Sequence, residues 1–211
     1  MKQKSRTEYS VMNTTVAFLA QTLAIFMGFF TRVVFTRTLS EGYVGINGLF
    51  TDILNILSLS ELGVGTAITY ALYAPIARRD IKKQQILMRM FRNFYRITAG
   101  FVLLAGLCLI PFLDILMKDR PDVNHLIIIY LLYLLNSVVS YLLIYKKTLV
   151  DAHQMNYITV MYHNGFLVLQ DILQIIVLFL TRNFILFLVI AVVCTIIGNI
   201  CMSRKADRLF P

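Results

Sequence analysis

The chain has 211 residues, of which 58% are hydrophobic and only 15% are charged, and its mean hydropathy is +0.73. Soluble globular domains carry charge on about a quarter of their residues, so this composition excludes a water-soluble protein. The net charge of +9 arises from 20 Lys and Arg residues against 11 Asp and Glu residues.

Six long apolar runs, taken in chain order, predict six transmembrane helices in an all-α polytopic membrane protein. A helix needs about 20 apolar residues to cross a hydrocarbon core of about 30 Å. The runs cover residues 11–31, 43–77, 97–117, 123–145, 155–181 and 184–203, and we expect them to form a single transmembrane lobe over residues 1–211. The first run has no small-residue cleavage site, which indicates an uncleaved span. The second run would measure about 50 Å as one helix, so it must tilt or bend.

The basic residues are distributed unevenly between the two sides of these predicted spans. Fifteen of the 20 Lys and Arg residues fall on the side that holds both termini and the loop after residue 77. The other side holds five: Arg32, Arg37, Lys118, Arg120 and Arg182. By the positive-inside rule, we expect both termini to be cytoplasmic. The net charge therefore reflects topology and contact with membrane lipids, and nucleic acid is not an expected partner.

Polar residues gather on one face of three predicted spans when successive residues are placed about 100° apart. Thr14, Gln21 and Arg32 share a face of the first span, Glu61 lies on the polar face of the second, and Gln170 and Gln174 lie on that of the fifth. Asp171 lies about 60° from this last face. A charged group within the bilayer costs at least about 2.5–3.5 kcal/mol, so such groups pair or face a water-filled path. We expect these faces to line a common groove, although polar residues also serve to pack membrane helices together.

Signatures of catalysis and of metal binding are missing from the sequence. It contains no Gly-rich phosphate loop, HExxH motif or GxSxG motif, so no catalytic residue, cofactor or enzymatic activity is expected. The cysteines Cys108, Cys194 and Cys201 lie in apolar runs at unrelated spacings, which favours neither disulfides nor a metal site.

The order of several segments resembles the amino-terminal part of bacterial polysaccharide flippases, the O-antigen and capsule exporters of the multidrug/oligosaccharidyl-lipid/polysaccharide exporter superfamily. These segments are "GFFTRVVFTRTLS", "EGYVGINGLFTDILNILSLSELGVGTAITYALYAPIA", "RRDIKKQQILMRMFRNFYRI", which we expect to be a basic cytoplasmic loop, and "YLLIYKKTLVDAHQMNY". The resemblance implies a multi-pass protein of the bacterial plasma membrane, with alternating access between two six-helix lobes and transport of undecaprenyl-diphosphate-linked oligosaccharide to the outer leaflet. Because relatives have a second lobe, we expect either a fragment, which we favour, or a lobe that pairs with another chain.

The resemblance and the polar faces together nominate substrate-binding residues in a central cavity. Arg32 and Arg37 would provide positive charge for the diphosphate, and the cavity candidates are Gln21, Glu61, Asp171, Gln170 and Gln174. The nearest rival function is that of a drug or cation antiporter of the same superfamily, in which Glu61 or Asp171 would bind a coupling cation. A membrane enzyme of envelope assembly and a scaffold subunit that does not transport are further, less favoured interpretations.

Overall fold

The computed structural model of the protein describes residues 6–58, 64–117, 123 and 125–210, and the described part is a bundle of long helices without a strand. The helices are α1 (Arg6–Thr38), α2 (Glu41–Ser58), α3 (Val64–Ala77), α4 (Ile81–Leu109), α5 (Leu113–Leu116), α6 (Leu126–Tyr141), α7 (Ile144–Ala152), α8 (Asn156–Thr181) and α9 (Phe184–Leu209), and a 3-10 turn, η2 (Ile110–Phe112), joins α4 to α5. The all-helical class predicted from the sequence is confirmed.

Five helical segments are long and apolar enough to cross a membrane, as in a multi-pass membrane protein. They are Ser10–Thr38, Ile81–Phe112, Leu126–Ala152, Asn156–Thr181 and Phe184–Leu209. The expected span 43–77 is instead divided between α2 and α3, and neither helix qualifies by itself. Within the described residues, the structure therefore supports five candidate spans directly.

The segment expected to be a basic loop after residue 77 is mostly helical. Asp80 caps α4, because its carboxylate accepts a hydrogen bond from the backbone N–H of Lys83 at 3.0 Å. Buried residues then recur at helical spacing along α4, among them Phe91, Tyr95 and Val102. This buried face continues into the apolar part of the helix, so the basic segment and the candidate span form one element.

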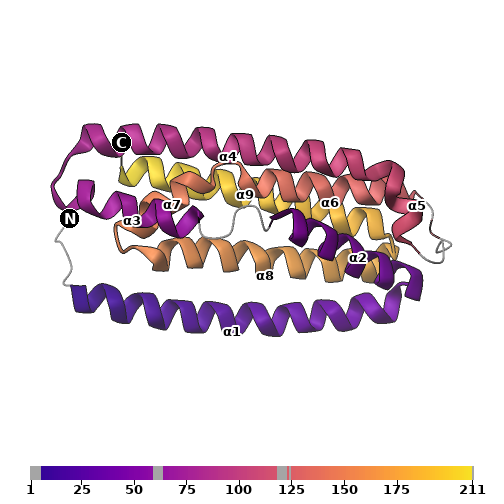
Figure 1. Ribbon diagram of the computed structural model, residues 1–211. Helices are drawn as coiled ribbons and strands as arrows, with labels where there is room; N and C mark the ends of the chain where they lie inside the picture. Colours follow the sequence, from indigo (N-terminus) through magenta and orange to yellow (C-terminus); the bar gives the residue numbers. More distant parts are fainter. Residues whose placement is uncertain (1–5, 59–63, 118–122, 124, 211) are drawn as a thin grey trace.

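The helices pack in the order α1, α8, α9, α6 and α4, so that helices distant in sequence become neighbours. Figure 1 shows α1 at one edge of the bundle and α4 at the opposite edge. The pair α2–α3 lies between these edges, with α2 packed on α6, and α3 on α4 and α7. The start of α1 and the end of α9 lie at the same end of the bundle (Figure 1).

Hydroxyl groups within the helices are largely used by their own backbone. Eight threonine side chains donate to the carbonyl four residues earlier: Thr31, Thr36, Thr38, Thr51, Thr69, Thr98, Thr148 and Thr181. Such bonds satisfy a hydroxyl where the bilayer offers no water. These threonines are therefore compatible with an apolar environment and need no ligand.

A close helix contact in the buried core joins α4 and α6 at Gly106. The Tyr130 hydroxyl donates to the Gly106 carbonyl at 2.8 Å, and the Tyr130 ring packs edge-on against Phe50. A Cβ atom at Gly106 would lie 2.3 Å from a methyl carbon of Leu134, which is itself buried. Glycine is therefore required for this approach, as in other tightly packed membrane helices.

Candidate ligand pocket

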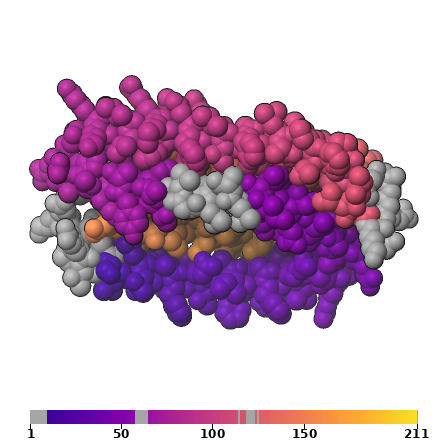
Figure 2. All heavy atoms as spheres, in the orientation of Figure 1, coloured from indigo at the N-terminus to yellow at the C-terminus, as the bar shows by residue number. Residues whose placement is uncertain are grey.

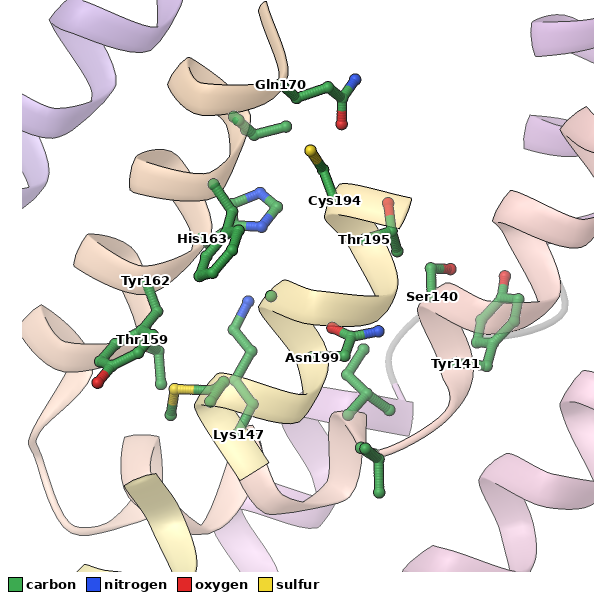
Figure 3. Close-up of a pocket in the computed structure, with 16 residues that line it drawn as sticks. Ser140, Tyr141, Lys147, Thr159, Tyr162, His163, Gln170, Cys194, Thr195 and Asn199 are labelled. Carbon is green, nitrogen blue, oxygen red and sulfur yellow. The ribbon is translucent and has the colours of Figure 1, made fainter. Parts of the chain in front are cut away.

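A pocket of about 320 Å³ opens between the α6–α7 junction, α8 and α9. Figure 3 shows side chains from these elements converging on it. Its walls are mixed, with apolar and aromatic side chains beside polar ones. The polar lining consists of Ser140, Tyr141, Lys147, Thr159, Tyr162, His163, Gln170, Thr195 and Asn199. We call it the Lys147 pocket.

The local structure that forms one wall of this pocket is a break between α6 and α7. Helix α6 ends at Tyr141 and α7 begins at Ile144, and Leu143 between them has a φ of 70°. A left-handed conformation is strained for a bulky L-residue, so tertiary packing must hold the break in place. Ser140 on one side of the break and Lys147 on the other both line the pocket.

Two adjacent lysines, Lys146 and Lys147, differ in whether their positive charge has a direct partner. The Lys146 ammonium lies 2.6 Å from the Asp207 carboxylate, an ion pair between α7 and α9. The Lys147 side chain instead points into the pocket, toward the His163 ring (Figure 3). Within the described part of the chain, its ammonium has neither a hydrogen-bond nor an ion-pair partner.

The carboxylate next along the helix does not neutralise Lys147 by direct contact. Asp151 lies one turn further on α7 and attracts the ammonium electrostatically. Its carboxylate accepts a hydrogen bond from the Thr159 hydroxyl at 2.6 Å, which ties α7 to α8. The half-buried ammonium therefore keeps its donors available for a ligand.

The neutral groups around the pocket are held in place but retain bonding capacity. The Asn199 amide donates to the Val139 carbonyl at 3.0 Å, and the Thr195 hydroxyl donates to Asn136 at 2.9 Å. Oxygen atoms of both side chains can still accept hydrogen bonds. Phe166 adds an aromatic wall, and it approaches Gly198 so closely that an added Cβ would lie 3.1 Å from its ring. The arrangement suits an anionic ligand that also carries hydroxyl groups.

Helix α8 presents its polar residues to two different neighbours, which separates the residues nominated from the sequence. Gln170 lines the Lys147 pocket, and Gln174 is buried beneath it, where its amide donates to the Phe187 carbonyl of α9 at 2.9 Å. Asp171 instead lies against the Thr31 hydroxyl of α1, which its carboxylate shares with the Met27 carbonyl. These residues therefore do not face one common groove.

The nominated residues of α1 are distributed along its length. The Gln21 carbonyl oxygen accepts a hydrogen bond from Asn164 of α8 at 3.3 Å. Arg32 and Arg37 are exposed near the far end of α1, with the Arg32 guanidinium 5.6 Å from the Phe35 ring centre. Glu61 lies outside the residues that the structure describes. Of the seven nominated residues, Gln170 is the one that lines the Lys147 pocket.

A second hollow lies at the end of the bundle where α1 begins. Figure 2 shows atoms of α8, in orange, at the floor of a furrow between α1 and the α2–α3 pair. At one end of this furrow lies an open hollow of about 440 Å³, lined by Ser10, Asn13, Thr69, Tyr73, Asp151, Gln154 and Asn156. Asn13 bridges this site, because it donates to the Gln154 carbonyl and accepts from the Tyr157 N–H. The polar groups of the Asn13 side chain therefore join α1 to α8.

The sequence does not nominate Lys147 as a site residue. It is one of the basic residues that we expect on the cytoplasmic side. No local pattern distinguishes it from Lys146, since the partner Asp207 is 61 residues away. One polar residue near it, Gln170, does lie on the polar face predicted for the fifth span. That shared face was the available signal that a polar site lies on this side of α8.

Comparison with known proteins adds no assignment: no family model, no curated protein and no solved structure matches this chain. Among the described residues, no group of three or more His, Cys, Asp or Glu side chains could hold a metal ion. Function must therefore be inferred from the chemistry of the pocket and from the resemblance of the sequence segments.

Proposed function

We propose that this chain is one helical lobe of a membrane exporter that moves undecaprenyl-diphosphate-linked oligosaccharide from the cytoplasmic to the outer leaflet. The observation that carries the proposal is the Lys147 pocket, where an ammonium without a direct partner lies among amide, hydroxyl and aromatic groups inside a bundle of membrane-length helices. A diphosphate needs the cation, and sugar hydroxyls need the amides and hydroxyls.

The placement of the pocket suits loading from the cytoplasm. The start of α1, the end of α9 and α7 all lie at the end of the bundle where the basic residues concentrate (Figure 1). By the positive-inside rule this end is cytoplasmic, so both termini would be cytoplasmic in a bacterial plasma membrane. The prenyl chain would stay in lipid while the diphosphate and sugars enter the pocket.

Exposed polar residues on other helices favour a partner lobe across an aqueous cavity. Thr51, Asp52 and Asn55 are exposed on α2, although this helix lies within a bundle of membrane-length helices. A carboxylate facing lipid there would be costly, so a water-filled cavity between two lobes accounts for it. Arg32 and Arg37, exposed on α1, would receive the diphosphate at the outer end of that cavity.

The alternative, a drug or cation antiporter, is kept because of Asp171. This carboxylate is half-buried at the contact between α1 and α8, where a cation could replace its hydrogen bond from Thr31. An antiporter would depend on this carboxylate more than on Lys147.

The proposal is tested by polysaccharide export in cells that carry Lys147→Gln, with Lys146→Gln as the matched control. Each variant removes one positive charge from α7, but only Lys147 lines the pocket. Hydrogen bonds to charged groups contribute about 1.5–3 kcal/mol, so Lys147→Gln should reduce export about 10- to 100-fold at equal membrane abundance. Lys146→Gln should stay within about twofold of wild type, since an exposed ion pair contributes little. Equal export by wild type and Lys147→Gln would contradict the proposal.

A further inference from the structure

A separate pocket of about 450 Å³ lies between α4, the α6–α7 break and α9. It adjoins the Lys147 pocket, since both are lined by Tyr141, Leu143 and Asn199. Its charged residues differ, because they come from α4 rather than from α7: Arg92 and Arg96. We call it the Arg92 pocket.

The two arginines lie one helical turn apart and thus on the same face of α4. The Nε atom of Arg92 is buried and has no hydrogen-bond partner within the described part of the chain. A buried N–H of a charged group without an acceptor is costly, and native proteins rarely leave one in that state. An acceptor is therefore expected to bind there.

Most of the remaining pocket wall is apolar, although Asn199 and three tyrosines also line it. Val139, Leu142 and Leu143 contribute from the α6–α7 break, and Ile196 and Ile200 contribute from α9. Leu142, Ile196 and Ile200 are also partly open to the surroundings of the bundle. A free phosphate ion would gain nothing from such walls, whereas a ligand with both an anionic group and a hydrocarbon chain would use both parts.

The depth of the pocket agrees with the boundary between headgroups and acyl chains. Arg96 directly precedes the apolar run 97–117, and the α6–α7 break lies near the end of the run 123–145. On α9, Ile200 lies near the end of the run 184–203. These three boundaries coincide at the cytoplasmic surface of the membrane, where anionic lipids attract basic residues.

We propose that the Arg92 pocket binds an anionic phospholipid. The phosphate accepts hydrogen bonds from the guanidinium groups of Arg92 and Arg96, and an acyl chain lies along Leu142, Ile196 and Ile200. The planar guanidinium fork suits phosphate oxygens better than a lysine would. Such a lipid would also bridge α4 to the α6–α7 break, so its binding should stabilise the bundle.

The test uses the purified full chain in a neutral detergent with added phosphatidylglycerol, and native mass spectrometry counts the lipids that remain bound. The variants are Arg92→Gln and Arg96→Gln, and the matched control is Arg89→Gln, an exposed arginine of α4 that does not line the pocket. We expect one tightly held phosphatidylglycerol on wild type and Arg89→Gln. Its apparent affinity should fall about 10-fold in each of the two pocket variants.

Two competition arms identify the ligand chemistry. Phosphatidylcholine, which has the chains without a net charge, and inorganic phosphate, which has the charge without chains, should both fail to displace the bound lipid. Arg96 is exposed, so Arg96→Gln tests the pocket even if Arg92→Gln fails to fold. Displacement by inorganic phosphate, equal binding of phosphatidylcholine, or unchanged retention in Arg96→Gln would each overturn the proposal.

Discussion

The two sides of α8 differ in whether the charged side chain that lies there has a direct partner within the described part of the bundle. Toward α1, Asn164 bonds to Gln21, and Asp171 bonds to Thr31. Toward α7 and α9, the Lys147 ammonium faces a pocket without a direct partner in the described part of the chain. Both sides carry polar residues at helical spacing, so polarity alone does not distinguish a packed contact from a ligand site. The two are distinguished by whether the bonding groups are still available to a ligand.

Lys146 and Lys147 show the same difference between a paired and an unpaired polar group at neighbouring positions. Both would be assigned to a cytoplasmic positive cluster from the sequence, yet one is paired with Asp207 and the other is not. The paired contacts should therefore carry stability, and the pocket should carry binding. Substitutions at each kind of position should separate these two quantities, with effects that range from a large loss of stability to almost none.

Gly106→Leu should have the largest effect, and it should act on stability. The new side chain would have to displace Leu134 from a buried position, because even a Cβ atom would lie 2.3 Å from it. Overpacking of this kind costs about 1–3 kcal/mol, and the α4–α6 contact offers no free volume to reduce the cost. Thermal unfolding in detergent should show a clear loss for Gly106→Leu. Gly48→Leu, at a position with no neighbouring atom within 4 Å, is the control and should unfold near wild type.

Thr31→Val should have an intermediate effect, because it keeps the side-chain shape but removes the hydroxyl that bonds to the Met27 carbonyl and to Asp171. Loss of a bond to a charged group costs about 1.5–3 kcal/mol, so unfolding should occur at lower temperature. Thr31→Ser should restore most of the stability.

Asp171→Asn provides the corresponding test of the antiporter alternative. An amide can still bond to Thr31, so stability and export should both remain close to wild type. Export abolished in a stably folded Asp171→Asn variant would instead assign this carboxylate to cation coupling.

Gln21→Leu should have the smallest effect. Its hydrogen bond with Asn164 is 3.3 Å long and Gln21 is exposed. Side-chain bonds between membrane helices contribute about 0.6 kcal/mol on average. Unfolding measurements should therefore show a small loss, and ligand affinity should be unchanged. A large loss of affinity would instead indicate that Gln21 binds the substrate.

The helical class and the apolar segments could be predicted from the sequence because hydrophobicity follows directly from composition. Helical periodicity placed Gln170 and Gln174 on one face of their helix, and both face the α9 side in the structure. It could not show that Gln21 would meet Asn164, because that contact joins residues 143 positions apart. Helical periodicity shows which residues share one face of a helix, but it does not show which helix packs against that face.

Two structural features explain the remaining differences. Leu142 and Leu143 give no sequence signal for a helix end, since neither is Gly or Pro, and the left-handed Leu143 depends on tertiary packing. Arg92 and Arg96 were counted as loop charges, because the sequence does not show that α4 continues from Ile81 into the membrane. Both pockets adjoin the α6–α7 break. Because the sequence gives no signal for this break, neither pocket could be predicted from it.

The proposed function depends above all on binding of the diphosphate of a lipid-linked oligosaccharide by Lys147. The most direct measurement is isothermal titration of the purified full chain with a short-prenyl diphosphate oligosaccharide, compared with the same oligosaccharide without phosphate. We expect Lys147→Gln to raise Kd for the diphosphate ligand about 10- to 100-fold, while Lys146→Gln changes it by less than about twofold. Neither substitution should alter the weak binding of the phosphate-free ligand. Equal Kd values for wild type and Lys147→Gln with the diphosphate ligand would contradict this role of Lys147.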